Sequence, residues 1–175
     1  MNKLRAILYG GLAAGTLDIL YAFIVYGPLT YHLSPQRVLQ SVAAGWVGRD
    51  AAVAGGLQTA ALGLASHFLI AAIMAAAFVI AATVFGALRR RPIFFGLLYG
   101  FLLYLMMNYV VTPLSAAHAS QHFAASAHEA AARLGEAFSA VRPKGAWLLA
   151  GTIFTHTVLV GLPIALIARR FSVRR

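Results

Sequence analysis

The sequence predicts an all-α polytopic membrane protein, a four-transmembrane-helix bundle. Its 175 residues are 61% hydrophobic and only 10% charged, whereas soluble domains average about 25% charged residues. Four apolar runs are each long enough to cross a bilayer, which takes roughly 20 helical residues. Basic residues stand at the ends of these runs, where lipid headgroups would meet them. We therefore expect a single transmembrane domain over residues 1–175, which does not bind nucleic acid despite a net charge of +10.

The first apolar run covers about residues 4–26 and contains an acid, Asp18. It exceeds the apolar length of about 7–15 residues that is usual in signal peptides, so we expect a retained first helix. Asp18 shares a helical face with the small residues Gly11 and Gly15, which allow another helix to approach closely. An ionisable group inside a membrane usually faces the bundle interior and has a partner. Asp18 is therefore expected to point into protein.

The first loop, residues 27–56, is predicted to begin where Gly27-Pro28 ends the helix. Ser34-Pro35 is typical of a helix start, with serine as the N-cap and proline in the first turn. From Gln36 to Val47 apolar residues recur at helical spacing, and Trp46 suits the level of the headgroups. We expect a short amphipathic helix lying in the membrane interface, with a soluble loop helix as the alternative.

The second and third spans are predicted over residues 57–88 and 93–112, on either side of three consecutive arginines. The second run is longer than one crossing needs, so the helix should tilt or stand above the bilayer. In the third span Gly96 and Gly100 form a small-x-x-x-small pair, a pattern that allows close helix packing.

The second loop, residues 113–145, is predicted to hold an Ala-rich helix outside the membrane, from Ala116 to Ala140. Within it Glu129 and Arg133 have the four-residue spacing of a helical ion pair. The same spacing separates two metal-ligand candidates, His118 and His122, which on a helix would share one face. The alternative is a solvated helix that happens to carry histidines.

The fourth span is expected over residues 146–168, which places both ends of the chain on one side of the membrane. That side holds nine basic residues and the other holds five, and excess positive charge marks the cytoplasmic side. We therefore predict cytoplasmic termini and extracytoplasmic loops at 27–56 and 113–145. The nine are Lys3, Arg5, Arg89, Arg90, Arg91, Arg169, Arg170, Arg174 and Arg175, and the five are Arg37, Arg49, Arg133, Arg142 and Lys144.

Each span contributes one polar residue to the outer half of the bundle in this topology: Asp18, His67, Asn108 and His156. At a helical rise of about 1.5 Å per residue, all but Asn108 lie roughly 12–15 Å below the outer surface. Asn108 lies somewhat higher. Intramembrane polar residues are functional candidates, so these four form the candidate site.

Four interpretations of this layer stay open. The first is structural, with Asp18 and Asn108 each hydrogen-bonded to one of the histidines. The second is a proton-linked Asp–His pair. The third is a metal held by His67, His156 and Asp18. The fourth is a haem b with His67 and His156 as its axial ligands. A chain without a cofactor is the first expectation, with haem and a divalent metal as alternatives.

The sequence predicts no enzyme. It contains no cysteine, no HExxH or GxSxG motif and no phosphate-binding glycine loop. The first expectation is a membrane scaffold or accessory subunit that contacts lipid and either itself or another membrane protein. A small proton-, ion- or solute-handling protein and a haem- or metal-binding redox subunit are the alternatives.

Between about residue 60 and residue 170, glycine, proline and histidine interrupt the apolar spans at positions that together form a pattern. The order is His67, Pro92, Gly96-Leu97-Leu98-Tyr99-Gly100, Thr112-Pro113-Leu114 and Thr155-His156. In these residues the chain resembles the YagU-type family of small bacterial inner-membrane proteins, and it departs from that family in the His-rich segment 118–128. The resemblance implies a bacterial inner-membrane location and brings no catalytic role.

Overall fold

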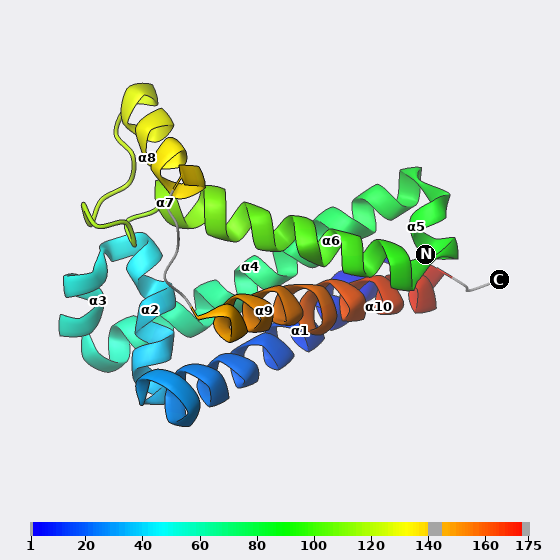
Figure 1. The fold of residues 1–175 in the computed structure, drawn as a ribbon. Helices are drawn as coiled ribbons and strands as arrows, with labels where there is room; N and C mark the ends of the chain where they lie inside the picture. The colour runs from blue at the N-terminus through cyan, green and yellow to red at the C-terminus, as the bar shows by residue number, and fades with distance from the viewer. Residues whose placement is uncertain (1, 140–144, 173–175) are drawn as a thin grey trace. The chain divides into compact units, whose positions relative to one another are not determined.

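The computed structural model describes residues 2–139 and 145–172, and no strand occurs among them. Four helical segments in these ranges are long and apolar enough to cross a membrane (Figure 1). The predicted all-α fold with four spans is thereby confirmed. The four segments are Lys3–Tyr31, Gly56–Val84, Pro92–Leu114 and Ala146–Phe171.

The chain divides into two compact units, each built from segments that are far apart in the sequence. The first unit comprises Met1–Tyr21, His67–Tyr104 and Lys144–Arg175. It contains most of α1 (Lys3–Tyr26), the second half of α4 (Gly56–Val84), α5 (Gly86–Arg90) and most of α6 (Pro92–Met106). It also contains α9 (Ala146–Phe154), the π-helical segment η3 (Thr155–Gly161) and α10 (Leu162–Ser172).

Glycines bring α1 against α4 in the first unit. A Cβ on Gly11 would lie 2.8 Å from Ala72 Cα, and one on Gly15 would lie 2.8 Å from the ring of Phe68. These separations are shorter than real Cβ contacts, so the face of α1 with its small residues packs directly on α4. Intramembrane helices use small residues for this purpose.

The glycine pair of α6 packs in the same way against the backbone of η3 and of the first residue of α10. A Cβ on Gly100 would lie 2.5 Å from Thr157 Cα, and one on Gly96 would lie 3.0 Å from Leu162 Cα. The approach is reciprocal, because a Cβ on Gly161 would lie 2.6 Å from Gly100 Cα. The largest fully buried side chains of this unit are Phe78, Val79 and Ile164.

The second unit comprises Ala22–Ser66 and Leu105–Pro143. It contains the end of α1, the start of α4 and several shorter elements. These are the π-helical segments η1 (Gly27–Tyr31) and η2 (Met107–Val111), and the helices α2 (Pro35–Val47), α3 (Arg49–Ala54), α7 (Thr112–Leu114) and α8 (Ala127–Ser139).

The helix predicted over Gln36–Val47 is α2, and it starts as the sequence indicates. The Ser34 side chain accepts a hydrogen bond from the Arg37 backbone N–H at 3.3 Å. A Cβ on Gly63 of α4 would collide with the Leu39 carbonyl, so α2 and α4 touch at the backbone. The sequence did not predict α3. This helix is separated from α2 by Gly48, whose backbone has a positive φ of 82°.

The α-helix of the first span ends at Tyr26, as the sequence predicts. The π-helical segment η1 then continues the span to Tyr31, with Pro28 in its first turn, where a missing N–H is tolerated. The predicted end of the second span is wrong. The second span ends at Val84 and not at residue 88, because Phe85 adopts an extended conformation and α5 begins a separate short helix.

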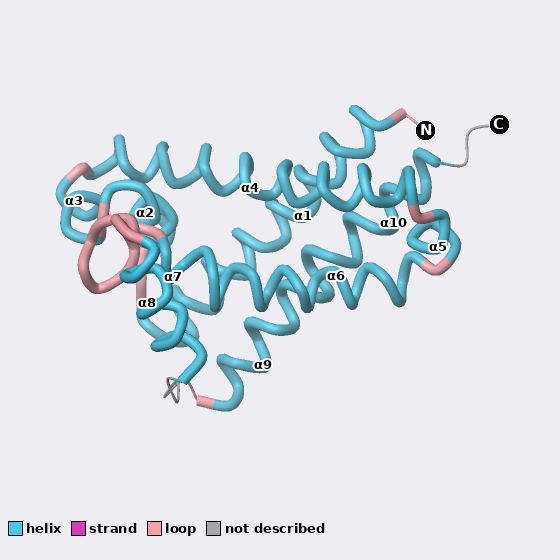
Figure 2. Tube along the Cα trace, turned by 90° about the horizontal axis from the view of Figure 1, so that it is seen from above, coloured by secondary structure: helices cyan, strands magenta, loops and turns pink. Residues whose placement is uncertain are grey.

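The helix predicted from Ala116 is also wrong in its first part, because residues 115–126 form a loop and α8 begins only at Ala127 (Figure 2). Ser126 accepts a hydrogen bond from the Glu129 N–H at 3.1 Å and so sets the helix start. Gln121 has a left-handed backbone (φ 60°), which a helix would not allow. His118 and His122 therefore do not share a helical face.

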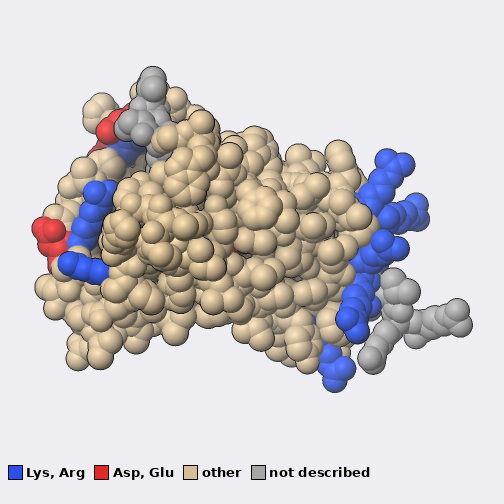
Figure 3. Space-filling view, turned by 60° about the horizontal axis from the view of Figure 1, so that its bottom comes forward, with Lys and Arg blue, Asp and Glu red and all other residues tan. Residues whose placement is uncertain are grey.

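Basic side chains gather at one end of the first unit (Figure 3). This end holds the start of α1, with Lys3 and Arg5, and the last turns of α5 and α10, each with two arginines. The Asn2 N–H donates to the Phe171 carbonyl at 3.3 Å, which fastens the start of α1 beside the end of α10. Four basic residues used in the predicted topology lie outside the described ranges: Arg142, Lys144, Arg174 and Arg175.

Candidate functional site

Three polar side chains from three helical segments of the first unit meet around Asp18. Asp18 comes from α1, His67 from α4 and Thr155 from the first position of η3. The Thr155 hydroxyl donates to Asp18 Oδ1 at 3.0 Å. His67 Nδ1 lies 3.9 Å from Asp18 Oδ2, a distance at which the groups interact electrostatically without a direct hydrogen bond.

The far side of the His67 ring fixes where its proton resides. His67 Nε2 lies 2.8 Å from the Gly15 carbonyl oxygen. A carbonyl oxygen only accepts hydrogen bonds, so Nε2 carries the hydrogen. A neutral imidazole has a single N–H, which leaves Nδ1 as a bare lone pair facing the Asp18 carboxyl group.

This arrangement gives the pair a place for one additional proton. With a neutral imidazole and an ionised carboxylate, the lone pairs of Nδ1 and Oδ2 would face each other unfavourably. A proton on either group removes that repulsion, as an imidazolium beside a carboxylate or as a neutral imidazole beside a carboxylic acid. The geometry around Asp18 and His67 therefore suits the binding of a single exchangeable proton.

The two members of the pair differ in their accessibility. The His67 side chain is 11% exposed and the Asp18 side chain is 30% exposed. The His67 ring also packs edge-on against Phe68, with 5.4 Å between ring centroids. The imidazole is thus held in place by packing, and the carboxyl group is the more exposed member of the pair.

Thr155 behaves differently from the two neighbouring threonines. Thr152 donates its hydroxyl to Leu148 O at 2.8 Å, and Thr157 donates to Ile153 O at 2.7 Å, each within its own span. Thr155 alone of the three is directed at Asp18, and the π-helical segment η3 begins there. Such segments are frequent at functional sites.

His156 is oriented by its own span. Its Nδ1 lies 2.9 Å from the Thr152 carbonyl oxygen, and its ring packs edge-on against Tyr104 with 5.9 Å between centroids. Within residues 2–139 and 145–172, no group of three or more His, Cys, Asp or Glu side chains is placed to hold a metal. His67 and His156 each place one ring nitrogen at a backbone carbonyl, a contact that metal- and haem-ligating histidines also make.

Asn108, the fourth member of the predicted layer, belongs to the second unit. It lies in η2 and is partly buried. The structure therefore unites Asp18 and His67 with Thr155, a threonine that the sequence offered only as a neighbour of His156. The sequence carried no signal that Thr155 and not Thr152 or Thr157 would contact the acid.

A second polar centre lies in the second unit, and the sequence predicted only its Glu129–Arg133 pair. Arg133 is only 4% exposed and donates to the His122 carbonyl at 2.9 Å and to Ser120 Oγ at 2.7 Å. It also pairs with Glu129, as the four-residue spacing predicts. Arg133 therefore organises loop 115–126 instead of standing on a solvated face.

The Glu129 carboxylate belongs to the same polar centre, because it contacts both Arg133 and the Ala125 N–H. Its pKa lies below the ordinary value, first because the Ala125 N–H donates to it and next because of the Arg133 guanidinium. Loop 115–126 is tied from its other side to α3. Arg49 donates to the Ala117 carbonyl at 2.8 Å, and Gln121 donates to Asp50 at 2.7 Å.

No protein-family model, curated protein or solved structure matches the chain. The resemblance to YagU-type proteins therefore stays a prediction.

Proposed function

We propose that this membrane protein handles a proton, or an ion or small solute coupled to a proton, through the Asp18–His67 pair. The observation that carries the proposal is the bond between His67 Nε2 and the Gly15 carbonyl, which turns the unprotonated Nδ1 toward Asp18. An imidazole gains and loses a proton between about pH 5 and 8. An acid inside a span is itself a common proton-relay element.

The chain's own groups suit both states of such a site. In the proton-loaded state, His67 Nδ1–H faces the Asp18 carboxylate and the pair is neutral overall. In the released state the carboxylate retains the Thr155 hydroxyl, which donates to Oδ1. Thr155 thus stabilises the charge that appears when the proton leaves, and the Gly15 carbonyl keeps the imidazole aimed at Asp18 throughout.

A structural role is the second candidate, and the same contacts favour it. The bonds of Asp18 and His67 connect α1 with η3 and with α4, as expected of interhelical hydrogen bonds in a scaffold or accessory subunit. Native mass spectrometry of the gently solubilised protein tests this role. Mass added by another polypeptide would support the accessory-subunit function.

The substitution Asp18→Asn separates the two candidates. Asparagine retains an oxygen that can accept from Thr155 but cannot ionise, so a purely structural site would survive it. The matched control is Glu136→Gln, an exposed acid in α8 of the second unit. Infrared difference spectra recorded between pH 5 and pH 8 would report protonation of carboxyl and imidazole groups.

The expected result is that Asp18→Asn folds with normal yield but loses the Asp18 carboxyl signal and the part of the imidazole signal that comes from His67, both of which the control retains. His67→Gln should lose the imidazole part. Wild-type signals unchanged in Asp18→Asn would refute the proton-linked function. Proteoliposomes that take up protons equally well with either variant would lead to the same conclusion.

We further propose the bacterial inner membrane as the location, with cytoplasmic termini and with α2 and α8 on the opposite side. The uneven distribution of Lys and Arg between the span ends supports this orientation. Because the chain contains no cysteine, single cysteines at Asn2 and Ser139 can be probed with a membrane-impermeant maleimide. Labelling of the Ser139→Cys variant alone from outside the inner membrane is expected, and the reverse pattern would invert the topology.

A further inference from the structure

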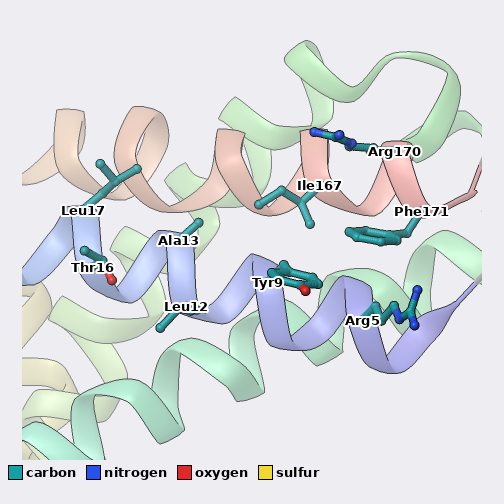
Figure 4. A pocket seen from close by; sticks show the side chains of 9 residues that line it. All are labelled: Arg5, Tyr9, Leu12, Ala13, Thr16, Leu17, Ile167, Arg170 and Phe171. Carbon is teal, nitrogen blue, oxygen red and sulfur yellow. The ribbon is translucent and has the colours of Figure 1, made fainter.

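A groove of about 810 Å³ runs between α1 and α10 in the first unit (Figure 4). Leu12, Ala13 and Ile167 contribute to its apolar walls. Arg5 on α1 and Arg170 on α10 line its end nearest the first and last residues of these helices. Between them, Tyr9 and Phe171 stack with their ring centroids 5.6 Å apart and their planes 3° from parallel.

The groove has the dimensions of one membrane leaflet. The α1 residues that line it extend from Arg5 to Leu17, which corresponds to about 18 Å of helix. One leaflet contributes roughly half of a hydrocarbon core that is about 30 Å thick. A lipid tail lying along Leu12 and Ala13 would therefore bring its headgroup to the level of Arg5.

The charge around this end is uniformly positive among the described residues. Lys3, Arg5, Arg169 and Arg170 stand at the adjoining ends of α1 and α10. Of the four acids in the chain, only Asp18 belongs to the first unit, and it lies 13 residues along the chain from Arg5. An anionic headgroup is complementary to such a cluster, whereas a zwitterionic one would bring a cationic group against it.

We propose that this groove is a binding site for one anionic phospholipid. Its anionic headgroup would be attracted by Arg5 on α1 and Arg170 on α10, which stand on either side of the stacked rings (Figure 4), and one acyl chain would lie against Leu12, Ala13 and Ile167. The stacked rings of Tyr9 and Phe171 would stand where the headgroup meets the tail, the level at which aromatic side chains favour a bilayer. The site is independent of the Asp18–His67 pair.

The test uses the full-length protein in mixed micelles of phosphatidylglycerol and phosphatidylethanolamine, with retained lipid measured by native mass spectrometry. The wild type is expected to retain phosphatidylglycerol preferentially. Loss of both groove charges in Arg5→Gln/Arg170→Gln should lower that preference roughly 30-fold, given the usual contribution of each basic residue near an anionic surface. The matched control Arg89→Gln/Arg90→Gln removes the same charge from α5, outside the groove lining, and should retain most of the preference.

A second variant tests the apolar half of the groove without changing charge. Ala13→Phe should fill it and lower the number of retained lipids, whereas Ile73→Phe, at an exposed position of α4, should not. Comparison of Ala13→Phe with Ile73→Phe tests the lipid site even if the double arginine variant fails to fold. Asp18→Asn should leave lipid retention unchanged, which keeps the outcome separate from the proton-linked function.

Three results would overturn the proposal. Equal retention of the two lipids by the wild type would remove the anionic preference. An equal loss in Arg89→Gln/Arg90→Gln would assign it to diffuse surface charge. Displacement of the bound lipid by inorganic phosphate alone would show a free-anion site in which the apolar groove has no role.

Discussion

The Thr155 hydroxyl donates to Asp18 Oδ1 at 3.0 Å and joins two residues that are 137 positions apart in the chain. Thr157, two positions further along, donates to Ile153 of its own span. The two threonines share a residue type and a helical segment but differ in the partner of their hydroxyl group. They therefore form a natural pair for measuring what the contact with Asp18 contributes.

Thr155→Val is expected to lower the free energy of unfolding by about 1 kcal/mol, in the range found for interhelical hydrogen bonds in membranes. Thr157→Val should change it by less than about 0.5 kcal/mol, since its bond lies within one helix. Unfolding in mixed micelles, followed by circular dichroism, measures both. Thr155→Ser should restore the stability. An equal loss in the two valine variants would mean that the bond to Asp18 has no special weight.

Gly100→Ala should destabilise the first unit by about 1–3 kcal/mol, the usual effect of overpacking a filled interior. The new methyl would collide with the His156 carbonyl and lie 2.5 Å from Thr157 Cα, and a backbone cannot rotate aside as a side chain can. The control is Gly135→Ala in α8, where a Cβ would meet nothing within 4 Å. That variant should gain up to about 1 kcal/mol of helix stability. A neutral Gly100→Ala would contradict the backbone contact between α6 and η3.

Arg133→Met should release loop 115–126. The substitution preserves much of the side-chain volume but removes the bonds to Ser120 and His122 and leaves Glu129 without its guanidinium partner. A loss of about 3 kcal/mol of local stability is expected for a buried charged group with several hydrogen bonds. Hydrogen exchange of amides in the loop measures it directly. Arg37→Met, at an exposed position of α2, should leave this protection unchanged, and unchanged protection in Arg133→Met would show that other contacts hold the loop.

The same loop should respond to acid. The native pKa of Glu129 lies below its ordinary value because the ionised carboxylate accepts from the Ala125 N–H and pairs with Arg133. Its stabilising effect is therefore complete above the ordinary carboxyl pKa of about 4.3 and is lost as the pH falls through the lower native pKa. Protection of the amides in loop 115–126, corrected for the intrinsic exchange rate, should stay constant from pH 7 to pH 5 and fall below about pH 4.

Glu129→Gln should remove that acid response and leave the loop less protected at neutral pH. Glu136→Gln should preserve it, because Glu136 lies 11 residues beyond Ala125 and meets the loop at His118, at 3.7 Å. If acid does not change the protection of the wild-type loop, after correction for the intrinsic rate of hydrogen exchange, then Glu129 does not hold the loop in place.

Much of the fold was predictable because it depends on short-range signals. Apolar runs long enough to cross a bilayer fixed the four spans, and the Ser34-Pro35 start fixed α2. The errors arose where non-local bonds override local preference. Alanine favours a helix at residues 116–125, but the backbone groups of Ala116 and Ala117 bond instead to Gly45 and Arg49, which hold the segment as a loop.

The candidate site was predictable only in part. Helical depth put Asp18, His67 and His156 at one level and left open which histidine would lie beside Asp18, because depth follows only from position along a span. The rotation of each helix about its axis does not follow from depth, and it decides that Thr155 and not His156 contacts Asp18. The π-helical segment at Thr155 changes that rotation within one span, and its sequence, Thr-His-Thr-Val-Leu-Val-Gly, carries no recognised signal for it.

The acceptor that positions His67 is the backbone carbonyl of Gly15. A point mutation changes a side chain and leaves the backbone carbonyl in place, so the acceptor of this hydrogen bond is present whatever residue stands at position 15. A substitution removes the hydrogen bond directly when it replaces His67. A side chain added at Gly15 would disturb the bond by moving the backbone, because a Cβ there would lie 2.8 Å from the Phe68 ring. Related chains that lose this orientation of the imidazole should therefore differ at position 15 or position 67. Chains that retain glycine and histidine at these positions should retain the geometry of the Asp18–His67 pair.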